Sequence, residues 1–573
     1  MNQPDNGTRR MMYFLLVAVA VVVGVLWASG LSYVDDDCFV SFRYAKNLIN
    51  GLGLVYNAEE RVEGYTNFLW TMLIAVGMKL GIDPIRCTTT AGIIFFALML
   101  LLYGYLSWKF KESGGRQLHW IPLTTLALCL HRDMAAHATS GMETSMFTFL
   151  ISVTYCLLLT RTKRGGIMAA GFVFVLAMMT RPDGIVFLFG AGLYLILTRK
   201  RAVWPVVWLL LPSVILFLPY WLWRYHYFGF FFPNTFYAKS VDLTYFSQGF
   251  AYAWLYLATY PILIIILPLG VVVWWGFSGQ TEGNRFLSAW HVIRGEGFSP
   301  HPVLLGALYI LLYTFFIIRM GGDFMFARFF IPITPVIYFI IEQLLYRRSR
   351  GMATIAIAAV ILLATYFRID HYRDNVFVGY IADEKKYFTQ VEPLEESQKE
   401  AALLKKHFDG LPVRVAFYAG QLRLIYYLDP VFAVESSSGL TDTAIAHEQI
   451  TERERPGHEK HPTLEYLIRR RVHFYIGPTE PIPPGQVVLN AISFDSLRAR
   501  IITYDNRIMS VLERDTAVSF IHLPVYLDDY IAKLPSTSRQ KAAYDYAFLK
   551  NFYFDVNSDT ARENAFLRYH RQE

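Results

Sequence analysis

Three consecutive carboxylic acids, Asp35, Asp36 and Asp37, follow the apolar run 11–31. A run of that length can cross a bilayer, so we expect the acids to emerge at a membrane surface. Carboxylates in such a position favour a functional interpretation, because lipid offers them no partner. One of them could take the proton from an attacking hydroxyl group. If Asp36 and Asp37 lie close together, their like charges should raise the pKa of one of them.

Further polar side chains recur at the ends of later apolar runs, on what the topology below makes the outer side. Each of them could bind an anion or orient a hydroxyl group. They are Arg43, Glu143, Arg181, Asn234, Tyr237, Lys239, Arg319, Asp323 and Arg328. Arginine and lysine bind phosphate oxygens, so these cations beside carboxylates suit a substrate with a phosphate head and a hydrocarbon tail.

Arg319 and Arg328 flank one short turn that begins with two glycines. There the two guanidinium groups could grip a phosphate from two sides, with Asp323 fixing an arginine or contacting the rest of the substrate. Simpler explanations stay open. Both arginines could snorkel to the membrane surface, Glu143 could interact with the dipole of the helix that it begins, and Arg-Pro-Asp-Gly at 181–184 could be only a tight turn.

The composition indicates a polytopic membrane protein, because 54% of the 573 residues are hydrophobic and only 17% are charged. A net charge of +7 could suggest a nucleic-acid partner. The basic residues instead cluster in short connectors between apolar runs, which the positive-inside rule explains better, so we expect no nucleic acid. These connectors are 109–116, 161–166, 199–201, 283–295 and 347–351.

Eleven apolar runs are predicted to cross the membrane, with the amino terminus inside. They are 11–31, 89–108, 119–134, 143–160, 167–180, 183–198, 203–222, 250–275, 302–319, 330–346 and 352–367. Residues 66–81 are short for a span of about 20 residues, so we predict a helix on the outer surface. The first run lacks a cleavage signal and is expected to stay as a span. Residues 32–88 then form a large outer loop.

The tail, residues 368–573, is predicted to be an α/β domain outside the membrane, following a membrane domain over 1–367. Runs such as 413–420 and 472–477 are typical of strands, and the tail is long enough to bury its own core. Its polar motifs predict an acceptor-binding surface or a cap over the membrane domain. The candidates there are Asp442, His447, His458, Glu459 and Lys460. Their spacing is not that of HExxH, so we expect no zinc site.

No cofactor is expected from the sequence. It has no Walker P-loop and no GxGxxG after a strand, although a divalent cation stays an open alternative. Cys129 and Cys156 fall inside apolar runs and are predicted to be buried, inert thiols. Cys38 and Cys87 would both lie outside, but we do not expect a disulfide.

The outer loop from Asp36 to Trp70 resembles the first outer loop of the GT-C glycosyltransferase superfamily. Within that superfamily it is most similar to the mycobacterial terminal β-(1→2)-arabinofuranosyltransferases and their relatives. Further blocks resemble this branch in the same order. They are 139–144, 180–184, 233–239, 321–332, 439–447 and 455–460.

The resemblance implies a transferase that moves a sugar from a polyprenyl-phosphate carrier to a hydroxyl group of a cell-envelope glycan or glycolipid on the outer face. It maps the acidic pair of the family to Asp36 as the catalytic carboxylate and Asp37 as an orienting one. Asp35 departs from the family pattern and leaves this register open by one residue. The nearest relatives imply arabinofuranose, but the same architecture serves other sugars.

Two other classes of function stay open. A transporter or flippase of lipid-linked sugars would have two related halves and charges in the middle of its spans, whereas here the charges gather on one face. A scaffold that binds a cell-wall polymer would leave the acidic run without a role. Replacing Asp36 with Asn separates an enzyme from a binder.

Overall fold

The computed structural model describes residues 6–112, 121–199, 201–264, 301–348, 352–478 and 488–571. The chain forms two compact units. The first comprises Met1–Ile49, Tyr65–Phe231 and Val241–Val391, and the second comprises Asn50–Gly64, Phe232–Ser240 and Glu392–Glu573. The predicted division at residue 367 therefore differs from the observed one in three places.

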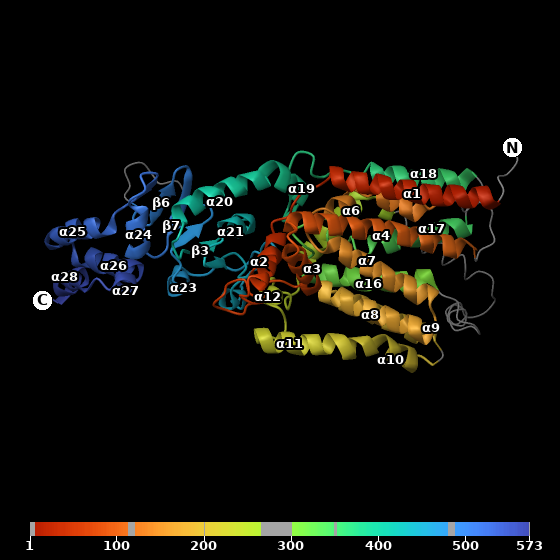
Figure 1. The fold of residues 1–573 in the computed structure, drawn as a ribbon, viewed down its shortest axis with the longest axis horizontal. Helices are drawn as coiled ribbons and strands as arrows, with labels where there is room; N and C mark the ends of the chain where they lie inside the picture. The colour runs from red at the N-terminus through yellow and green to blue at the C-terminus, as the bar shows by residue number, and fades with distance from the viewer. Residues whose placement is uncertain are drawn as a thin grey trace. The chain divides into compact units, whose positions relative to one another are not determined.

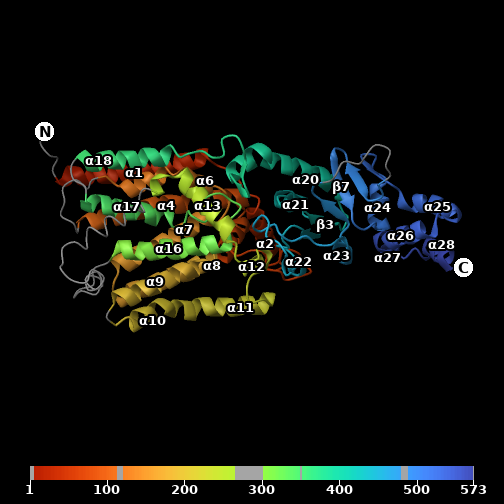
Figure 2. The same ribbon diagram turned by 180° about the vertical axis from the view of Figure 1, so that it is seen from behind.

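The first unit is a bundle of apolar helices that lie side by side (Figures 1 and 2). Its helices are α1 (Asn6–Gly30), α2 (Cys38–Ile49), α3 (Phe68–Lys79), α4 (Pro84–Glu112), α5 (Leu123–Cys129), α6 (Arg132–His137), α7 (Thr144–Thr160), α8 (Arg164–Thr180), α9 (Gly184–Thr198), α10 (Val203–Pro212), the π-helical turn η1 (Ser213–Phe217), α11 (Leu218–Phe228), α13 (Phe246–Thr259), α16 (Pro302–Met320), α17 (Thr334–Arg348) and α18 (Met352–Tyr366).

Within the described ranges, four helices are long and apolar enough to cross a membrane, which makes this a multi-pass helical membrane protein. They are Gly7–Gly30, Pro84–Phe110, Val203–Phe228 and Pro302–Met320. Most of the other predicted runs fold as shorter apolar helices. The predicted surface segment 66–81 contains α3, whose 12 residues are too few for a span.

The predicted run 119–134 is broken into the short helices α5 and α6. The His131 side chain accepts a hydrogen bond from the Met134 backbone N–H and so begins a new helix. Parts of the predicted topology lie outside the described residues. These are residues 119–120 and 265–275 of two runs, the connector 283–295, and portions of the connectors 109–116, 199–201 and 347–351.

A small hairpin explains why residues 368–391 belong to the first unit. Strands β1 (Phe377–Val378) and β2 (Ile381–Ala382) pair antiparallel. The Ala382 backbone N–H donates to the Phe324 carbonyl oxygen at 2.7 Å, and the Phe326 N–H donates to the Ala382 carbonyl oxygen at 2.9 Å. The hairpin is thus hydrogen-bonded to the loop after α16. It is followed by α19 (Glu384–Lys386) and the π-helical turn η3 (Tyr387–Val391).

The second unit contains a six-stranded sheet in the order β4-β3-β5-β7-β6-β8, in which β4, β3 and β5 are parallel and the others antiparallel. Val415 lies opposite both Ala433 and Phe474. The strands are β3 (Arg414–Phe417), β4 (Phe432–Glu435), β5 (Phe474–Ile476), β6 (Ala491–Phe494), β7 (Leu497–Ile501) and β8 (Val518–Phe520). The helices include α12 (Asn234–Ala238), α20 (Leu394–Phe408), α21 (Leu422–Leu428), α22 (Thr443–Ala446), α23 (Leu464–Arg469), α24 (Asn506–Leu512), α25 (Leu523–Lys533), α26 (Arg539–Leu549) and α28 (Thr560–Arg571).

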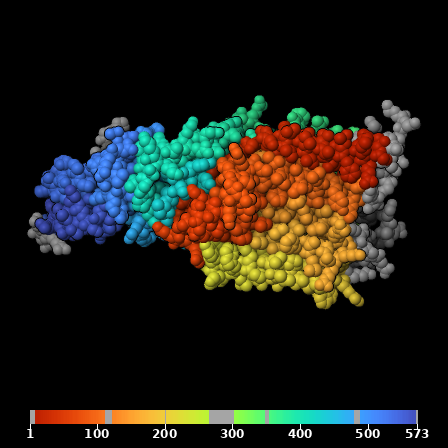
Figure 3. Space-filling view, in the orientation of Figure 1, coloured from red at the N-terminus to blue at the C-terminus, as the bar shows by residue number. Residues whose placement is uncertain are grey.

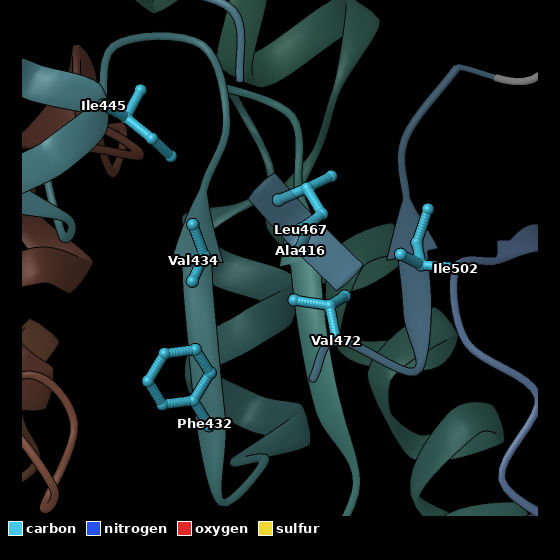
Figure 4. Close-up of a cluster of buried hydrophobic side chains, with 7 residues drawn as sticks. All are labelled: Ala416, Phe432, Val434, Ile445, Leu467, Val472 and Ile502. Atoms are coloured by element: carbon cyan, nitrogen blue, oxygen red, sulfur yellow. The ribbon is translucent and has the colours of Figure 1, made fainter. Parts of the chain in front are cut away.

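Apolar side chains of β3 and β4 pack with apolar side chains of neighbouring segments and build part of the core of this unit (Figure 4). They are Ala416, Phe432, Val434, Ile445, Leu467, Val472 and Ile502. Burial of such side chains is the main stabilising contribution of a core.

Polar contacts explain why two segments of the predicted membrane domain belong to the second unit. The Asn57 amide donates to the carbonyl oxygen of Ala433 at 3.0 Å and accepts from its N–H at 2.9 Å. It therefore pairs with the edge of β4 as a neighbouring strand would. Asn234 donates to the carbonyl oxygens of Gly439 and Leu440 at 2.8 and 3.0 Å. These contacts hold residues 50–64 and 232–240 against the sheet.

Candidate active site

The acidic run lies in the turn between α1 and α2, where Asp35 and Asp36 are 1% and 3% exposed. The Asp35 backbone N–H donates to the Ser140 carbonyl oxygen at 2.9 Å, and its carboxylate oxygen Oδ1 accepts from the Asp37 N–H at 3.0 Å. The Cys38 thiol donates to the Asp35 carbonyl oxygen. Asp35 therefore shapes the turn that presents Asp36 and Asp37 at the amino-terminal end of α2, an end that favours negative charge.

Asp35 carries the raised pKa that the sequence predicts for the pair Asp36 and Asp37. Burial raises the pKa of the Asp35 carboxyl to about 8, the Asp37 carboxylate adds to the rise, and Arg328 opposes it. This rise favours the protonated, neutral form of Asp35. Its second oxygen, Oδ2, is buried and has no hydrogen-bond partner among the described residues.

Glu143 is the centre of a buried network of charges in the first unit. It accepts hydrogen bonds from Arg328 Nη2 at 3.1 Å and Asn67 Nδ2 at 2.9 Å, and Arg181 Nη1 lies 3.5 Å away. Glu143 precedes α7, but its side chain makes no capping bond to that helix. Burial raises its pKa, yet the two arginines outweigh this and hold the pKa below its usual value. The predicted interaction with the helix dipole is thus secondary to these ion pairs.

Each arginine of this network also binds a second carboxylate. Arg181 donates two hydrogen bonds to Asp183, at 3.1 and 3.0 Å, and Asp183 also accepts from the Tyr313 hydroxyl at 2.5 Å. The turn Arg-Pro-Asp-Gly is therefore more than a connector. Arg328 Nη1 lies 3.6 Å from Asp323 Oδ2. Burial lowers the pKa of each guanidinium, but the carboxylates raise it further, so both stay charged.

The backbone just before Arg328 is strained. Ala327 has a φ of 63°, and the Arg328 N–H donates to the Phe326 carbonyl oxygen at 2.8 Å across it. This is the rare form of the γ-turn. The His137 ring nitrogen Nε2 lies 3.0 Å from the same Phe326 oxygen, and the Ala382 pairing holds the residues in front. Strained residues of this kind cluster at functional sites.

The structure brings Glu143, Arg181, Asp323 and Arg328 together, and Arg328 also interacts electrostatically with Asp35 and Asp37. Arg43 is buried in α2 of the same unit. Arg319 is elsewhere, in the last turn of α16, where its guanidinium donates to the Val241 carbonyl oxygen at 3.5 Å. Arg328 is directed towards Glu143 and Asp323, so the described contacts give the two arginines different partners, and their clamp on a phosphate stays a prediction.

Three residues predicted on the donor side lie instead in the second unit. Asn234 binds the backbone before α22, and the Tyr237 ring stacks on His447 with centroids 4.1 Å apart. A Cβ atom at Gly457 would lie 3.5 Å from Lys239 Cε, so Lys239 lies against the neighbourhood of His458. The candidates predicted on the donor side are therefore divided between the two units, and these three lie in the same unit as the acceptor-side candidates.

Several acceptor-side candidates bind within their own unit. Asp442 caps α22 through the N–H groups of Ala444 and Ile445 and accepts from the Tyr466 hydroxyl at 2.6 Å. Glu459 accepts from Arg453 Nε at 2.7 Å, and Lys460 donates to the Ala446 carbonyl oxygen. Burial and the charge of Arg455 lower the pKa of His458 to about 3, so it is neutral.

The described residues contain no group of three or more His, Cys, Asp or Glu side chains that could hold a metal ion. The four cysteines, which include the predicted outer pair Cys38 and Cys87, are free thiols, and Cys129 and Cys156 are buried as predicted.

A second buried charge cluster in the first unit was not predicted. Asp133 accepts from Arg368 Nη1 at 3.0 and 3.2 Å, from Arg132 at 3.0 Å and from the Tyr260 hydroxyl at 2.6 Å. Asp383 pairs with both arginines. The signal was available, because His-Arg-Asp interrupts the apolar run 119–134. Asn67, which binds Glu143, offered no comparable signal.

Known proteins resemble this chain in sequence over about half of its length. No family model matches the chain. It is 26% identical over 336 residues to a terminal β-(1→2)-arabinofuranosyltransferase of Mycobacterium tuberculosis, covering 55% of this chain and 53% of that protein. An enzyme of the same name from Corynebacterium glutamicum is 27% identical over 365 residues, which are 56% of this chain and 50% of that protein.

The chain spans about half the length of the curated relatives that it matches. The resemblance of the sequence to this branch is confirmed. Among solved structures, ArnT from Cupriavidus metallidurans in the apo state aligns with a TM-score of 0.48 at 15% identity, covering 85% of this chain and 97% of that one. ArnT bound to undecaprenyl phosphate aligns with a TM-score of 0.46 at 14% identity, covering 75% and 86%.

Proposed function

We propose that this protein is an integral membrane glycosyltransferase of the GT-C type. It moves a sugar from a polyprenyl-phosphate donor to a hydroxyl group of a cell-envelope glycan or glycolipid on the outer face of a bacterial plasma membrane. The observation that carries the proposal is the acidic turn Asp35 to Asp37, which is presented at a helix end beside the buried network of Arg328 and Glu143. The named activity of the two relatives supports the same class of reaction.

In the proposed reaction Asp36 accepts the proton of the acceptor hydroxyl group. The hydroxyl oxygen forms a bond to the anomeric carbon of the sugar, the bond from that carbon to the phosphate oxygen breaks, and the lipid phosphate leaves with the electron pair. Asp37 orients the acceptor or the sugar. The leaving phosphate is already ionised, so it needs stabilisation of charge and no proton.

The donor phosphate is proposed to bind at Arg328 and Arg181, with Arg43 of α2 in the same unit as a further candidate. Arg328 Nε and Arg181 Nη1 are buried and make no hydrogen bond among the described residues. Glu143 holds both guanidinium groups in fixed directions, and such preorganised donors stabilise charge most effectively. Arg181 thus replaces Arg319 as the partner of Arg328.

The sugar is proposed to be held by buried oxygen atoms of the first unit that can still form hydrogen bonds. Asp35 Oδ2, Asp323 Oδ2 and the Thr144 hydroxyl are buried without hydrogen bonds among the described residues. A neutral Asp35 can donate through Oδ2, whereas Asp323 accepts. Sugar hydroxyl groups do both, so a mixture of donors and acceptors suits them. The relatives favour arabinofuranose, and this reaction needs no metal because the phosphodiester has a single negative charge.

The second unit is proposed to bind the acceptor outside the membrane. The Tyr237 ring stacked on His447, together with Lys239 beside Gly457, carries this proposal, because these candidates come together within one unit. A flippase or a wall-binding scaffold remains the competing class. Neither gives Asp36 and Asp37 a chemical role.

Mass spectrometry of lipids that co-purify with the protein tests the donor. We expect a polyprenyl phosphate or polyprenyl-phosphate sugar, and we expect less of it in a variant with Arg181→Gln and Arg328→Gln. The variant Arg319→Gln is the matched control, because it removes the same charge outside the network. Equal amounts of polyprenyl lipid in all three proteins would contradict the proposed phosphate site.

A further inference from the structure

A shallow apolar groove of about 440 Å³ lies between α8 and the α10–η1 helix of the first unit. Eight residues line it. They are Gly165, Met168, Ala169 and Phe172 from α8, and Leu211, Pro212, Ile215 and Leu216 from the end of α10 and from η1. Helices α8 and α10 belong to the same part of the bundle (Figures 1 and 2), and α10 and α11 form an outer edge of it in the space-filling view (Figure 3).

Local backbone geometry accounts for the groove. A Cβ atom at Gly171 would lie 2.2 Å from the Leu209 carbonyl oxygen, so the glycine allows α10 to approach α8 closely at one point. Beyond it, Pro212 has no N–H group, and the next five residues form the π-helical turn η1. Such a turn is wider than an α-helical one and commonly marks a functional site.

Lipid is the solvent around this groove. The helix Val203–Phe228 is long and apolar enough to cross a membrane, and only 11% of its most apolar window is buried in the protein. A hydrocarbon chain therefore fits the lining, which contains no charged side chain.

One end of the groove is basic. Gly165 lines the groove and follows Arg164, whose guanidinium carbon lies 3.6 Å from the centre of the Trp208 ring. This cation–π contact holds the guanidinium beside the groove. Arg161 and Lys163 are also exposed there. Between described residues, none of these three cations forms a salt bridge. Helix α8 has no side-chain cap, so its dipole adds positive potential at the same end.

We propose that this groove binds an anionic phospholipid, with an acyl chain along Met168 and Phe172 and the phosphate at Arg164 and Lys163. The positive charge at one end of the groove favours an anionic lipid head group. The apolar lining alone would not distinguish between head groups. The site lies at the opposite end of the 17-residue helix α8 from Arg181, about 25 Å away. It is therefore separate from the proposed donor site and does not depend on the proposed reaction.

Native mass spectrometry of the full-length protein in detergent tests the proposal, with phosphatidylglycerol and phosphatidylcholine as probes. The wild-type protein should bind phosphatidylglycerol more tightly than phosphatidylcholine. A variant with Lys163→Gln and Arg164→Gln should lose that preference, with affinity for phosphatidylglycerol reduced about thirtyfold, since each of the two basic residues near a lipid surface contributes about 1 kcal/mol. Arg86→Gln is the matched control at the start of α4 and should leave the preference unchanged.

The variant Ala169→Trp tests the acyl-chain part, because the larger side chain fills the groove without changing charge. It should weaken phosphatidylglycerol binding, whereas Phe189→Trp on the exposed face of α9 should not. Equal binding of the two lipids by the wild-type protein would overturn the proposal and leave the basic residues as topology signals alone. If the wild-type protein is a dimer and Ala169→Trp is a monomer, a second copy of the chain occupies the groove. That result would also overturn the proposal.

Discussion

Arg328 donates through Nη2 to Glu143 Oε1 at 3.1 Å and so joins two segments that are 185 residues apart in the chain. Arg181 lies 3.5 Å from the same oxygen. One carboxylate therefore orients two buried guanidinium groups, and Arg328 in turn acts on the acidic turn through Asp35 and Asp37. This arrangement links three sequence blocks that look independent.

Replacing Arg328 with Lys should destabilise the protein by about 1–3 kcal/mol. A single ammonium group cannot serve Glu143 and Asp323 together, and it leaves buried oxygens without donors. The midpoint of thermal unfolding in detergent measures this change. Arg319→Lys is the control and should cost less than about 0.5 kcal/mol. Equal shifts for the two variants would favour snorkelling for both arginines.

Stability should fall as the pH rises towards 8, because of Asp35. The folded protein keeps a proton on this carboxyl up to about pH 8, whereas the unfolded chain releases it near 3.8. The contribution is complete below the lower value and is lost as pH rises through the higher one. Asp35→Asn mimics the protonated acid and keeps an acceptor for the Asp37 N–H. Thermal unfolding between pH 6 and 9 should therefore depend less on pH in this variant. An unchanged slope would refute the assignment.

Ala327→Gly should leave the protein unchanged or stabilise it by up to about 1 kcal/mol. Glycine adopts a positive φ without the steric cost of a Cβ atom, which offsets its larger entropy loss. The control is Ala177→Gly, in the buried interior of α8, where the same change should cost about 1 kcal/mol or more. Thermal unfolding of both variants tests the γ-turn. A loss at Ala327 as large as at Ala177 would argue against it.

Asn57→Leu should expose the edge of β4 in the second unit. The change removes both partners of the Ala433 backbone, at a cost of about 2–4 kcal/mol for two buried groups. Asn57→Asp keeps the acceptor and loses the donor, so its effect should be smaller. Hydrogen exchange at the Ala433 amide reports the difference directly. Protection that survives in Asn57→Leu would show that the pairing does not hold the loop.

The helices were predictable because apolar runs reveal their own positions. The ends of α7, α8, α9 and α16 fall within a few residues of the predicted runs. The break between α5 and α6 was hidden, since hydropathy averages over the His-Arg-Asp triplet that caps the second helix. The sequence also did not reveal that residues 50–64 and 232–240 belong to the second unit. Their place there depends on hydrogen bonds that Asn57 and Asn234 make to residues far along the chain.

The candidate site was predictable in its residue types more than in its pairing. Glu143, Arg181, Asp323 and Arg328 were all selected from their positions at helix ends. Which cation meets which carboxylate depends on the packing of α7 against its neighbours and on the γ-turn at Ala327. Sequence spacing suggested Arg319 as the partner of Arg328. In the structure, Arg181 is the arginine that shares the Glu143 carboxylate with Arg328.

Transfer activity of the Asp36→Asn variant tests the central claim most directly. Purified protein is incubated with a polyprenyl-phosphate arabinofuranose donor and an arabinan oligosaccharide, and the product is weighed by mass spectrometry, with thermal unfolding measured in parallel. We predict that the wild-type protein adds one sugar residue and that Asp36→Asn loses at least about 100-fold in rate, as expected for removal of a general base, with its unfolding midpoint unchanged. A folded Asp36→Asn protein that transfers the sugar at the wild-type rate would contradict the account.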